Sequence, residues 1–505
     1  MIIAQTFNGP DVDWFALSPM IVLVSAAMLL LLVGALTPTW PRGLYAIVTA
    51  AAAVAAGVLS MVLWDDVSDD GAETLVGGAL ALDTFALFVT IAICAAVVLL
   101  ALTADDYLRR EELDGPEVYA LFLVAATGGV VMASANDLIV LFIGLETLSL
   151  AFYVLAASYR RKAGSAESGM KYLVLGGFSS AFLLYGIALV YGAVGTTNIS
   201  RMVETLSGNV PLERNDALIL AGIALMLVGL GFKVAAVPFH LWTPDVYEGA
   251  PTPVTGFMAS VGKVAAFAAL LRVFVVGLPF YRDDWRPAIW VLAVLSLVVG
   301  SVLAVVQTDV KRMLAYSSIS HAGFILVGVE AAGHRAGQAD AGLGVSSSLV
   351  YLLAYAVMVA GTFGVVALVS RRGDRSTDLD AFQGLGRSRP VLALALTVFL
   401  VAQAGVPFTS GFIAKFGVIS AGVDERSYTL AVIAMVSSVI AAFLYLRIMV
   451  SAWMADEPEG DGAATLRIPF SAGLAIALAV GFTLAVGIFP EWLINAAEQT
   501  TEFAR

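Results

Sequence analysis

The stretch Gly229-Leu-Gly-Phe-Lys233-Val-Ala-Ala-Val-Pro238-Phe-His240 places a lysine and a proline at the end of a long apolar segment. Residues 216–238 are long enough to cross a bilayer, because a spanning helix needs about 20 mostly apolar residues. Pro238 removes a backbone donor and interrupts the helical hydrogen bonds. In lipid, such a break persists only where protein or internal water satisfies the freed groups. The sequence therefore predicts a broken helix inside a membrane protein.

A second interruption, Val406-Pro407-Phe408, repeats the Val-Pro-Phe of residues 237–239 after 169 residues and five predicted spans. Each break has a lysine nearby: Lys233 lies five residues before its proline and Lys415 eight residues after its own. An odd number of spans inverts the second copy in the membrane. Broken helices at matched positions of inverted repeats are typical of transport proteins and of their binding sites.

The composition excludes several classes of protein. Of 505 residues, 60% are hydrophobic and 13% are charged, about half the roughly 25% charge of a soluble domain. The net charge of -12 argues against a nucleic-acid partner. With Cys94 alone, no disulfide can form within the chain and no cysteine-ligated iron–sulfur cluster is possible. Three scattered histidines make a poor metal set, and no phosphate-binding or dinucleotide fingerprint occurs. We therefore expect no metal and no cofactor in this chain.

The hydropathy pattern predicts an all-α integral membrane protein with about fourteen transmembrane helices. They form two inverted five-helix repeats, with broken helices at the seventh and twelfth spans. We expect an N-terminal three-helix segment (1–115), a first repeat (116–278), a second repeat (279–453) and a last helix with its tail (454–505). The predicted spans are 15–36, 43–63, 79–102, 116–133, 135–157, 168–194, 216–238, 253–278, 287–306, 311–332, 343–370, 389–423, 427–453 and 469–488.

The basic residues predict the orientation in the membrane. Met1 to Trp14 contains no basic residue, so the first span is expected to be retained rather than removed as a signal. The loops of one side hold fourteen of the 27 basic residues, Lys311 among them, against seven on the other side and six within spans. Basic loops favour the cytoplasm, so both termini are predicted outside it. The arginine-rich, lysine-poor composition points to a bacterium and hence to its plasma (inner) membrane.

Four charged residues are predicted deep in the spans, and they are the principal candidates for proton transfer. A charge at the bilayer centre costs at least about 2.5–3.5 kcal/mol, so we expect Lys233, Lys263 and Lys415 to have a functional role. A buried lysine can also lose its proton, whereas arginine stays charged. Glu146 lies halfway along an otherwise apolar span, and Lys233 is its natural partner.

A second group of polar residues leaves its role open between proton transfer and structure. Hydroxyls and a histidine within the tenth span could support a water chain or join helices through hydrogen bonds. A lysine near a helix end could instead extend to the interface, and a histidine after the break could serve as a cap. Asp83, at the start of the third span, is predicted to be an interfacial cap. The secondary candidates are Lys171, His240, Tyr316, Ser317 and His321.

Three motifs resemble the antiporter-like subunits of respiratory complex I. The first runs from Gly229 to Val254 and includes Leu-Trp-Thr-Pro-Asp-Val-Tyr followed by Glu-Gly-Ala-Pro. The second is Lys311-Arg-Met-Leu-Ala-Tyr-Ser-Ser-Ile-Ser-His321, and the third is Gly405-Val-Pro-Phe-Thr-Ser-Gly-Phe-Ile-Ala-Lys415-Phe. The form of the first motif is similar to subunit N of bacterial NADH–quinone oxidoreductases. Lys415 also departs from the sister M subunit, which typically has a glutamate there.

The resemblance implies a role for each deep charge. Glu146 and Lys233 resemble the pair on the fifth and seventh helices, Lys263 the central lysine of the eighth, and Lys415 the terminal lysine of the twelfth. The implied function is a proton-translocating membrane-arm subunit of a translocase, with no redox chemistry in this chain. FMN, iron–sulfur clusters and quinone would belong to partner subunits. The implied neighbours are the lipid bilayer and other subunits, the M and K subunits in particular.

Two alternatives remain open at this stage. One is a subunit of a multi-subunit sodium/proton antiporter that works without electron transfer. The other is a purely structural scaffold, which would explain the hydrophobicity but not three deep lysines.

Overall fold

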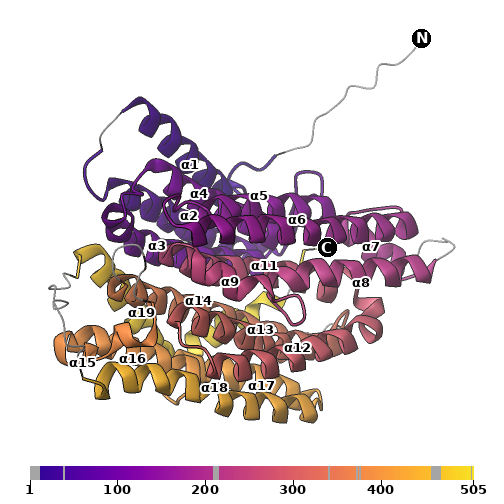
Figure 1. The fold of residues 1–505 in the computed structure, drawn as a ribbon. Helices are drawn as coiled ribbons and strands as arrows, with labels where there is room; N and C mark the ends of the chain where they lie inside the picture. Colours follow the sequence, from indigo (N-terminus) through magenta and orange to yellow (C-terminus); the bar gives the residue numbers. More distant parts are fainter. Residues whose placement is uncertain are drawn as a thin grey trace.

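Helices account for most of the chain (Figure 1), as the series of apolar segments predicts. The computed structural model describes residues 12–37, 40–208, 215–338, 342–370, 374, 377–456, 468–501 and 503–504. Among these residues, thirteen helices are long and apolar enough to cross a membrane, and a shorter apolar helix covers Pro390–Ala404. That helix and the one after it together occupy the predicted twelfth span. The predicted all-α membrane architecture is thus confirmed.

The first six spans follow one another with short connections. Asp83 begins α3 and Asp137 begins α5, each accepting a hydrogen bond from a backbone N–H of the first turn, which satisfies donors that a helix start leaves free. A two-stranded antiparallel hairpin, β1 (Glu73–Leu75) with β2 (Leu80–Leu82), joins the second and third spans. The six spans are α1 (Ser18–Leu36), α2 (Leu44–Asp70), α3 (Thr84–Arg110), α4 (Pro116–Ser134), α5 (Leu138–Ala156) and α6 (Ala163–Val194).

The seventh span is broken, but the break begins earlier than Pro238. The helix α8 (Asp216–Lys233) ends at the lysine, and α9 (Trp242–Gly249) resumes after it. Ala235 has φ +60°, and the backbone N–H of Ala236 reaches back to the carbonyl of Gly231, which is a left-handed helix ending. The helix therefore stops before the proline rather than at it. The Val237–Pro238 peptide bond is cis.

The eighth span is the most irregular. It consists of α10 (Thr252–Phe257), the π-helix η1 (Met258–Gly262), α11 (Lys263–Leu270) and the π-helix η2 (Leu271–Gly277). Lys263 therefore stands at the junction between a π-helical and an α-helical segment. π-Helical turns occur frequently at functional sites. All residues of this span are buried within the protein.

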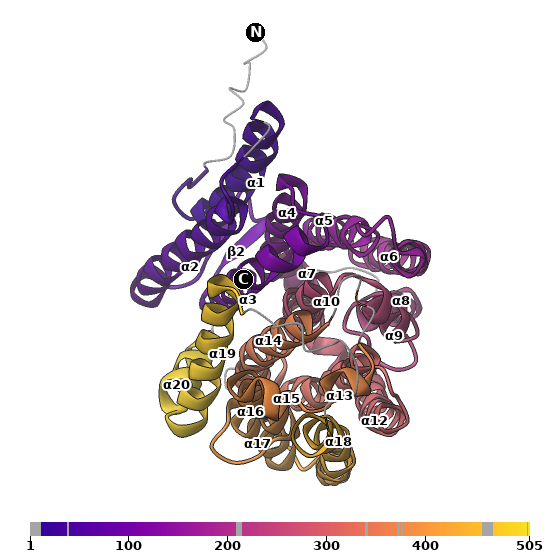
Figure 2. The same ribbon diagram turned by 60° about the vertical axis from the view of Figure 1, so that its left-hand side comes forward.

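The second half begins with three long helices and then contains the second break. α14 lies at the centre of the bundle (Figure 2) and is buried along its whole hydrophobic window. The helices are α12 (Arg282–Val305), α13 (Val310–Arg335), α14 (Leu343–Val369), α16 (Pro390–Ala404), α17 (Ser410–Asp424), α18 (Tyr428–Met454) and α19 (Phe470–Ile488). Shorter elements are α7 (Ile199–Leu206), η3 (Pro279–Tyr281), η4 (Leu379–Phe382), α15 (Leu385–Ser388), α20 (Glu491–Glu498) and η5 (Gln499–Thr501).

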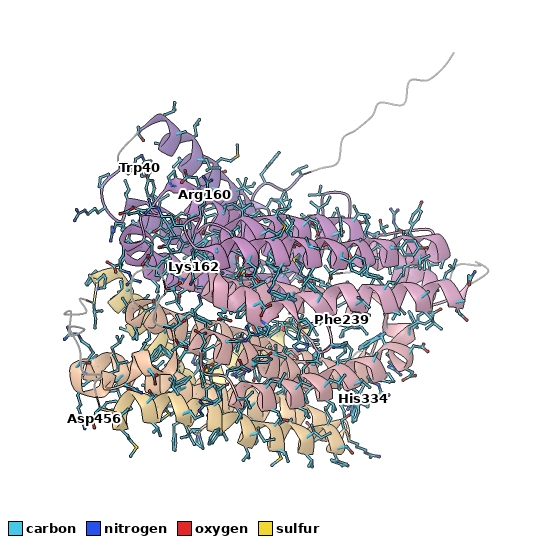
Figure 3. The ribbon with its side chains drawn as sticks, in the orientation of Figure 1. Trp40, Arg160, Lys162, Phe239, His334 and Asp456 are labelled. Atoms are coloured by element: carbon cyan, nitrogen blue, oxygen red, sulfur yellow. The ribbon has the colours of Figure 1, made fainter. Side chains whose placement is uncertain are left out.

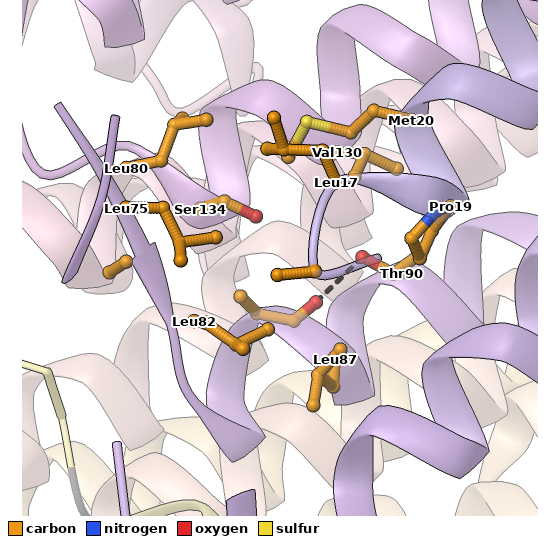
Figure 4. Close-up of a pocket in the computed structure, with 13 residues that line it drawn as sticks. Leu17, Pro19, Met20, Leu75, Leu80, Leu82, Leu87, Thr90, Val130 and Ser134 are labelled. Atoms are coloured by element: carbon orange, nitrogen blue, oxygen red, sulfur yellow. Dashed lines mark hydrogen bonds between the residues drawn. The ribbon is translucent and has the colours of Figure 1, made fainter. Parts of the chain in front are cut away.

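The two ends of the bundle can be followed from labelled side chains (Figure 3). Arg160, Lys162 and Asp456 lie toward one end of the helices, whereas His334 lies toward the other. An apolar pocket of about 20 Å³ between α1, the hairpin and α3 contains no titratable side chain among its lining residues (Figure 4). The hydroxyl of Thr90, which lines this pocket, donates a hydrogen bond to the carbonyl of Ala86 in its own helix. This pocket therefore offers no chemistry.

Candidate proton-transfer site

Lys233 is the last residue of α8, and it points into a pocket formed by α5 and α6. Its exposed fraction is 7%, and its Nζ donates to Ser149 Oγ at 2.6 Å. The rings of Tyr153 and Tyr172 lie with their centroids 5.4 Å from Nζ, and the ring of Phe232 at 5.8 Å. Aromatic faces attract a cation electrostatically. The pocket therefore stabilises an ammonium group without requiring a carboxylate in contact.

Glu146 lies one helical turn from Ser149 on the same face of α5, since residues three apart are neighbours on a helix. It is partly buried and accepts a hydrogen bond from Ser180 of α6. Among the described residues, no ion pair within 4 Å joins Glu146 to Lys233. The two predicted partners are held by different serines: Ser149 contacts the lysine and Ser180 contacts the glutamate.

Side chains of the first break satisfy its backbone groups, as a break in lipid requires. The indole N–H of Trp242 donates to the carbonyl of Phe232 at 3.0 Å, and the N–H of Val237 donates to Ser296 Oγ at 2.9 Å. The break is thereby fixed by α9 on one side and α12 on the other.

Lys263 reaches across to α13. Its exposed fraction is 2%, and its Nζ donates to the carbonyl of Ser318 at 2.5 Å. The ring of Tyr355 lies 5.6 Å from Nζ. The helix α11, which Lys263 begins, packs against α8, the helix of Lys233. The central lysine is therefore linked to both halves of the protein.

His321 is the centre of a hydrogen-bonded row on α13, α14 and α18. Its Nδ1 lies 2.6 Å from the hydroxyl of Tyr351, and its Nε2 lies 3.1 Å from the hydroxyl of Tyr445. The Tyr445 hydroxyl is also 2.6 Å from Ser317 Oγ. Hydroxyls and imidazole can each accept and donate, so this row can pass a proton along. The structure brings two secondary candidates, Ser317 and His321, together here.

Lys415 ends the row at the second break. Its exposed fraction is 5%, and its Nζ lies 4.7 Å from the ring centroid of Phe324, one turn of α13 from His321. Nζ donates to Ser438 Oγ at 2.9 Å and to the carbonyl of Ala404 at 3.0 Å. Ala404 is the last residue of α16, so the lysine of α17 caps the carbonyl end of the preceding half-helix.

The other secondary candidates lie apart from this row. Lys171 is half-buried and pairs with Glu167 and Asp245, each at 2.7 Å. His240 is buried in the first break, and its Nδ1 has no hydrogen-bond partner among the described residues. Tyr316 is partly buried and packs against the apolar core. Lys171 thus belongs to an ion-pair cluster at one end of the bundle.

Burial would raise the pKa of Asp245, but hydrogen bonds from Lys171 and Arg312 lower it overall. The bond from Arg312 is 2.9 Å, and Arg312 also pairs with Glu248 at 2.7 Å. These ion pairs tie α9 to α6 and to α13. They anchor the half-helix that follows the first break.

Two buried ion pairs were not anticipated from the sequence. Asp83 caps α3 as predicted, but it also binds Arg272 through both guanidinium nitrogens at 2.6 Å, and both side chains are almost fully buried. Lys311 was placed among the loop residues, which is wrong: it lies in the first turn of α13 with 0% exposure, 3.6 Å from Asp374. A residue at the end of an apolar run looks interfacial in sequence, and only the packing of other helices buries it.

The tyrosines of the row were also missed. Tyr351 and Tyr355, four residues apart on α14, face the same side of a helix, and this spacing was the available signal. Tyr445 stands alone in an apolar segment, so the sequence contained no signal for its role.

Two broken helices, each with a buried lysine, and further buried polar groups between them are features of antiporter-like membrane proteins. The sequence model of the family described as "NADH:quinone oxidoreductase/Mrp antiporter, TM" matches residues 135–441, which include both breaks. A subunit of the Mrp complex from Dietzia has the same fold, with a TM-score of 0.80 over 96% of each chain at 21% identity.

Closer relatives define the family. The chain is 41% identical to NADH-quinone oxidoreductase subunit N 3 of Streptomyces griseus over 99% of its length and 96% of the relative's. It is 40% identical to subunit N of Rhodococcus opacus over 100% of its own length and 99% of the relative's. A chain of respiratory complex I from Thermus thermophilus matches with a TM-score of 0.77 and 30% identity, covering 95% of this chain and 100% of that one. The chain therefore belongs to the family of NADH-quinone oxidoreductase subunit N.

Proposed function

We propose that this chain is a proton-translocating subunit in the membrane arm of a bacterial NADH-quinone oxidoreductase, and that it moves protons through Glu146, Lys233, Lys263 and Lys415. The observation that supports this most directly is the set of three lysines, each 7% exposed or less and each hydrogen-bonded to a serine hydroxyl or a carbonyl inside the protein. Redox chemistry takes place in partner subunits, which hold the FMN, the iron–sulfur clusters and the quinone. The translocase activity therefore belongs to the assembly.

The contacts suggest how the row works. While the Glu146 carboxylate is charged, one turn of α5 from the serine that contacts the lysine, it favours the protonated form of Lys233. A rearrangement that moves Glu146 away weakens that attraction, and the proton passes toward Lys263. From there the hydroxyls and imidazole around His321 relay it toward Lys415. Each unit of pKa difference is worth about 1.36 kcal/mol, so shifts of a few units suffice to direct the transfer.

We further propose that the subunit lies between sister subunits, with the M subunit and the K subunit as neighbours. The basic end of the bundle near Arg160 and Lys162 would face the cytoplasm, which places both termini outside it in the bacterial plasma membrane. The alternative function, in a sodium/proton antiporter, draws on a shared fold at 21% identity and on a family model that covers both groups, whereas the subunit N relatives match the whole length at about 40% identity.

The test is made on the native membrane assembly, purified through a tag on this chain. We expect NADH-driven quinone reduction and acidification of vesicles by the same particle. Glu146→Gln should slow this coupled turnover while NADH oxidation by an artificial acceptor stays intact. A particle without flavin or NADH activity, but with sodium-dependent proton movement, would favour the antiporter. Unchanged coupled turnover in Glu146→Gln would refute the role of the glutamate.

A further inference from the structure

Lys311 is a buried lysine that the row from Lys233 to Lys415 does not include. Its Nζ donates to the carbonyl of Ala250 at 2.5 Å and lies 3.6 Å from Asp374 Oδ2. That same carboxylate oxygen accepts the hydroxyl proton of Tyr107 at 2.6 Å. A lysine, unlike an arginine, can give up its proton when buried. Lys311 is thus a further group that can bind and release a proton. It lies near the end of the bundle rather than midway along it.

On one side of this pair lies a charged cleft open to solvent. Its volume is about 430 Å³, and Asp374 forms part of its wall. Lys162, which lies toward the basic end of the bundle in Figure 3, lines it as well. The other charged lining residues are Glu167, Lys171, Asp245, Glu248, Asp309, Arg312 and Asp378. The carboxylate of Asp374 therefore connects an aqueous cleft with a fully buried amine.

On the other side, buried hydroxyls lead toward Lys263. Thr252 follows Ala250 by two residues, and its hydroxyl has no hydrogen-bond partner among the described residues. The same holds for the hydroxyls of Ser318 and Tyr355, and the Tyr355 side chain lies against Ser318. Ser318 is the residue whose carbonyl accepts from Lys263. Buried hydroxyls that lack a protein partner are sites that ordered water can bridge.

The spacing along α13 fits a short path. Lys311 and Ser318 are seven residues apart, two helical turns, so they share a face of the helix about 10 Å apart. The segment from α9 to α10 runs beside it and packs against α13 and α14. Ordered water between the hydroxyls can complete a path of this length.

We propose that Lys311 and Asp374 form the inner gate of a proton-uptake path from this cleft to Lys263. Water in the cleft gives a proton to Asp374, which passes it to the neutral amine of Lys311. The ammonium so formed passes one proton to the hydroxyls of Thr252, Tyr355 and Ser318 and to the water between them. These groups deliver one proton to Lys263. Each O–H or N–H bond that forms is matched by one that breaks, so the net change is one proton from the cleft to Lys263. The inference rests on the proposed function, to which it adds the uptake route.

The first experiment compares two substitutions that each remove one cation at the same end of the bundle. Lys311→Met removes the gate, and Arg161→Met removes an exposed cation that pairs with Glu112. In the purified assembly, reconstituted in vesicles, we expect Lys311→Met to lower NADH-driven proton pumping by about ten-fold or more, as for loss of a proton-transfer group. Arg161→Met should pump as the unsubstituted protein does, and both should oxidise NADH with an artificial acceptor at the normal rate. Normal pumping by Lys311→Met would overturn the proposal.

The second experiment measures access without turnover, so it stays informative if the assembly proves not to be driven by NADH. Cys94 is the one native cysteine and is buried, so Cys94→Ser provides the background. Ser318→Cys is exposed to a small charged methanethiosulfonate, added to one face of the vesicles at a time. We expect modification from the face of the cleft, several-fold faster when Lys311→Ala opens the gate. No reaction in either variant, or equal reaction from both faces, would contradict the path while leaving the proposed function intact.

Discussion

The two broken helices repeat Val-Pro-Phe, yet their lysines stand on opposite sides of the break. Lys233 ends the first half-helix of its pair, whereas Lys415 lies in the second half-helix of its own. Lys233 points away from its break to a hydroxyl on α5. Lys415 folds back and caps the half-helix before its break. The same Val-Pro-Phe sequence therefore accompanies two different lysine contacts: one to a neighbouring helix and one to the preceding half-helix.

The surroundings of the breaks differ as well. Val237 of the first break is 6% exposed, whereas Val406 and Phe408 of the second are 45% and 73% exposed. The first break is fixed by a hydrogen bond from the indole N–H of Trp242 to the carbonyl of Phe232 and by one from the N–H of Val237 to the hydroxyl oxygen of Ser296. In a membrane, the second break requires lipid or a neighbouring subunit to cover its apolar side chains. Pro238 and Leu241 of the first break are exposed as well, so both breaks meet lipid or a neighbour, and the second does so along all three residues of its Val-Pro-Phe.

The largest difference is expected from removing each lysine in turn. Lys233→Gln should reduce NADH-driven proton pumping by about ten-fold or more, because an amide cannot take up and release the proton. Lys415→Gln should reduce it less, because a polar group of a neighbouring subunit that covers the second break can replace the terminal group. The measurement is acidification of vesicles per NADH oxidised. Equal loss in both would show that the difference in exposure has no functional consequence.

The hydroxyl partners of the lysines provide a matched pair of smaller changes. Ser149→Ala leaves Lys233 without its hydrogen-bond acceptor in a buried pocket, and bonds to charged groups contribute about 1.5–3 kcal/mol. Ser438→Ala leaves Lys415 bonded to the carbonyl of Ala404, so the loss should be smaller. Thermal unfolding of the purified assembly, followed together with coupled turnover, measures both. A larger effect of Ser438→Ala would reverse the comparison.

Backbone substitutions at the breaks should have modest effects of different size. Gly405 has φ +89°, and a Cβ there would lie 2.8 Å from Cδ of Lys415. Gly405→Ala should therefore destabilise the protein by at least about 1 kcal/mol and displace the lysine. Ala235, with φ +60°, already adopts this conformation, so Ala235→Gly should change stability by less than about 1 kcal/mol. The melting temperatures of the two variants test this prediction. Equal shifts would contradict the larger destabilisation expected for Gly405→Ala.

The smallest expected effect is the dependence on pH of the ion pairs that anchor α9. The folded-state pKa of Asp245 is lowered by Lys171 and Arg312, so its contribution to stability is present above the unfolded pKa of about 3.9. It is lost as the pH falls through the lower folded value. Asp245→Asn should abolish this acid-side loss and slightly destabilise α9 at neutral pH. Hydrogen exchange of residues 242–249 at pH 7 and at a series of pH values below about 3.9 measures it. Equal pH dependence in the variant would exclude Asp245 as the cause.

The sequence was sufficient for the spans, the two breaks and the depth of Lys233, Lys263 and Lys415. These features depend on local properties: an apolar run long enough for a bilayer, a proline that removes a donor, and a charge far from either end of its run. The start of the first break was less well predicted, because the helix ends by a left-handed turn at Ala235 that no residue type announces.

The tertiary structure alone decided which groups the lysines contact. Ser149, Ser318 and Ser438 meet them from other helices, and a hydrogen bond depends on distances that no periodicity encodes. The burial of Lys311 was also decided by the tertiary structure. Its position at a helix end predicts exposure to solvent, but other segments pack over the side chain and exclude the solvent. Composition and hydropathy thus determined a membrane protein with charges at depth, and packing determined how those charges are connected.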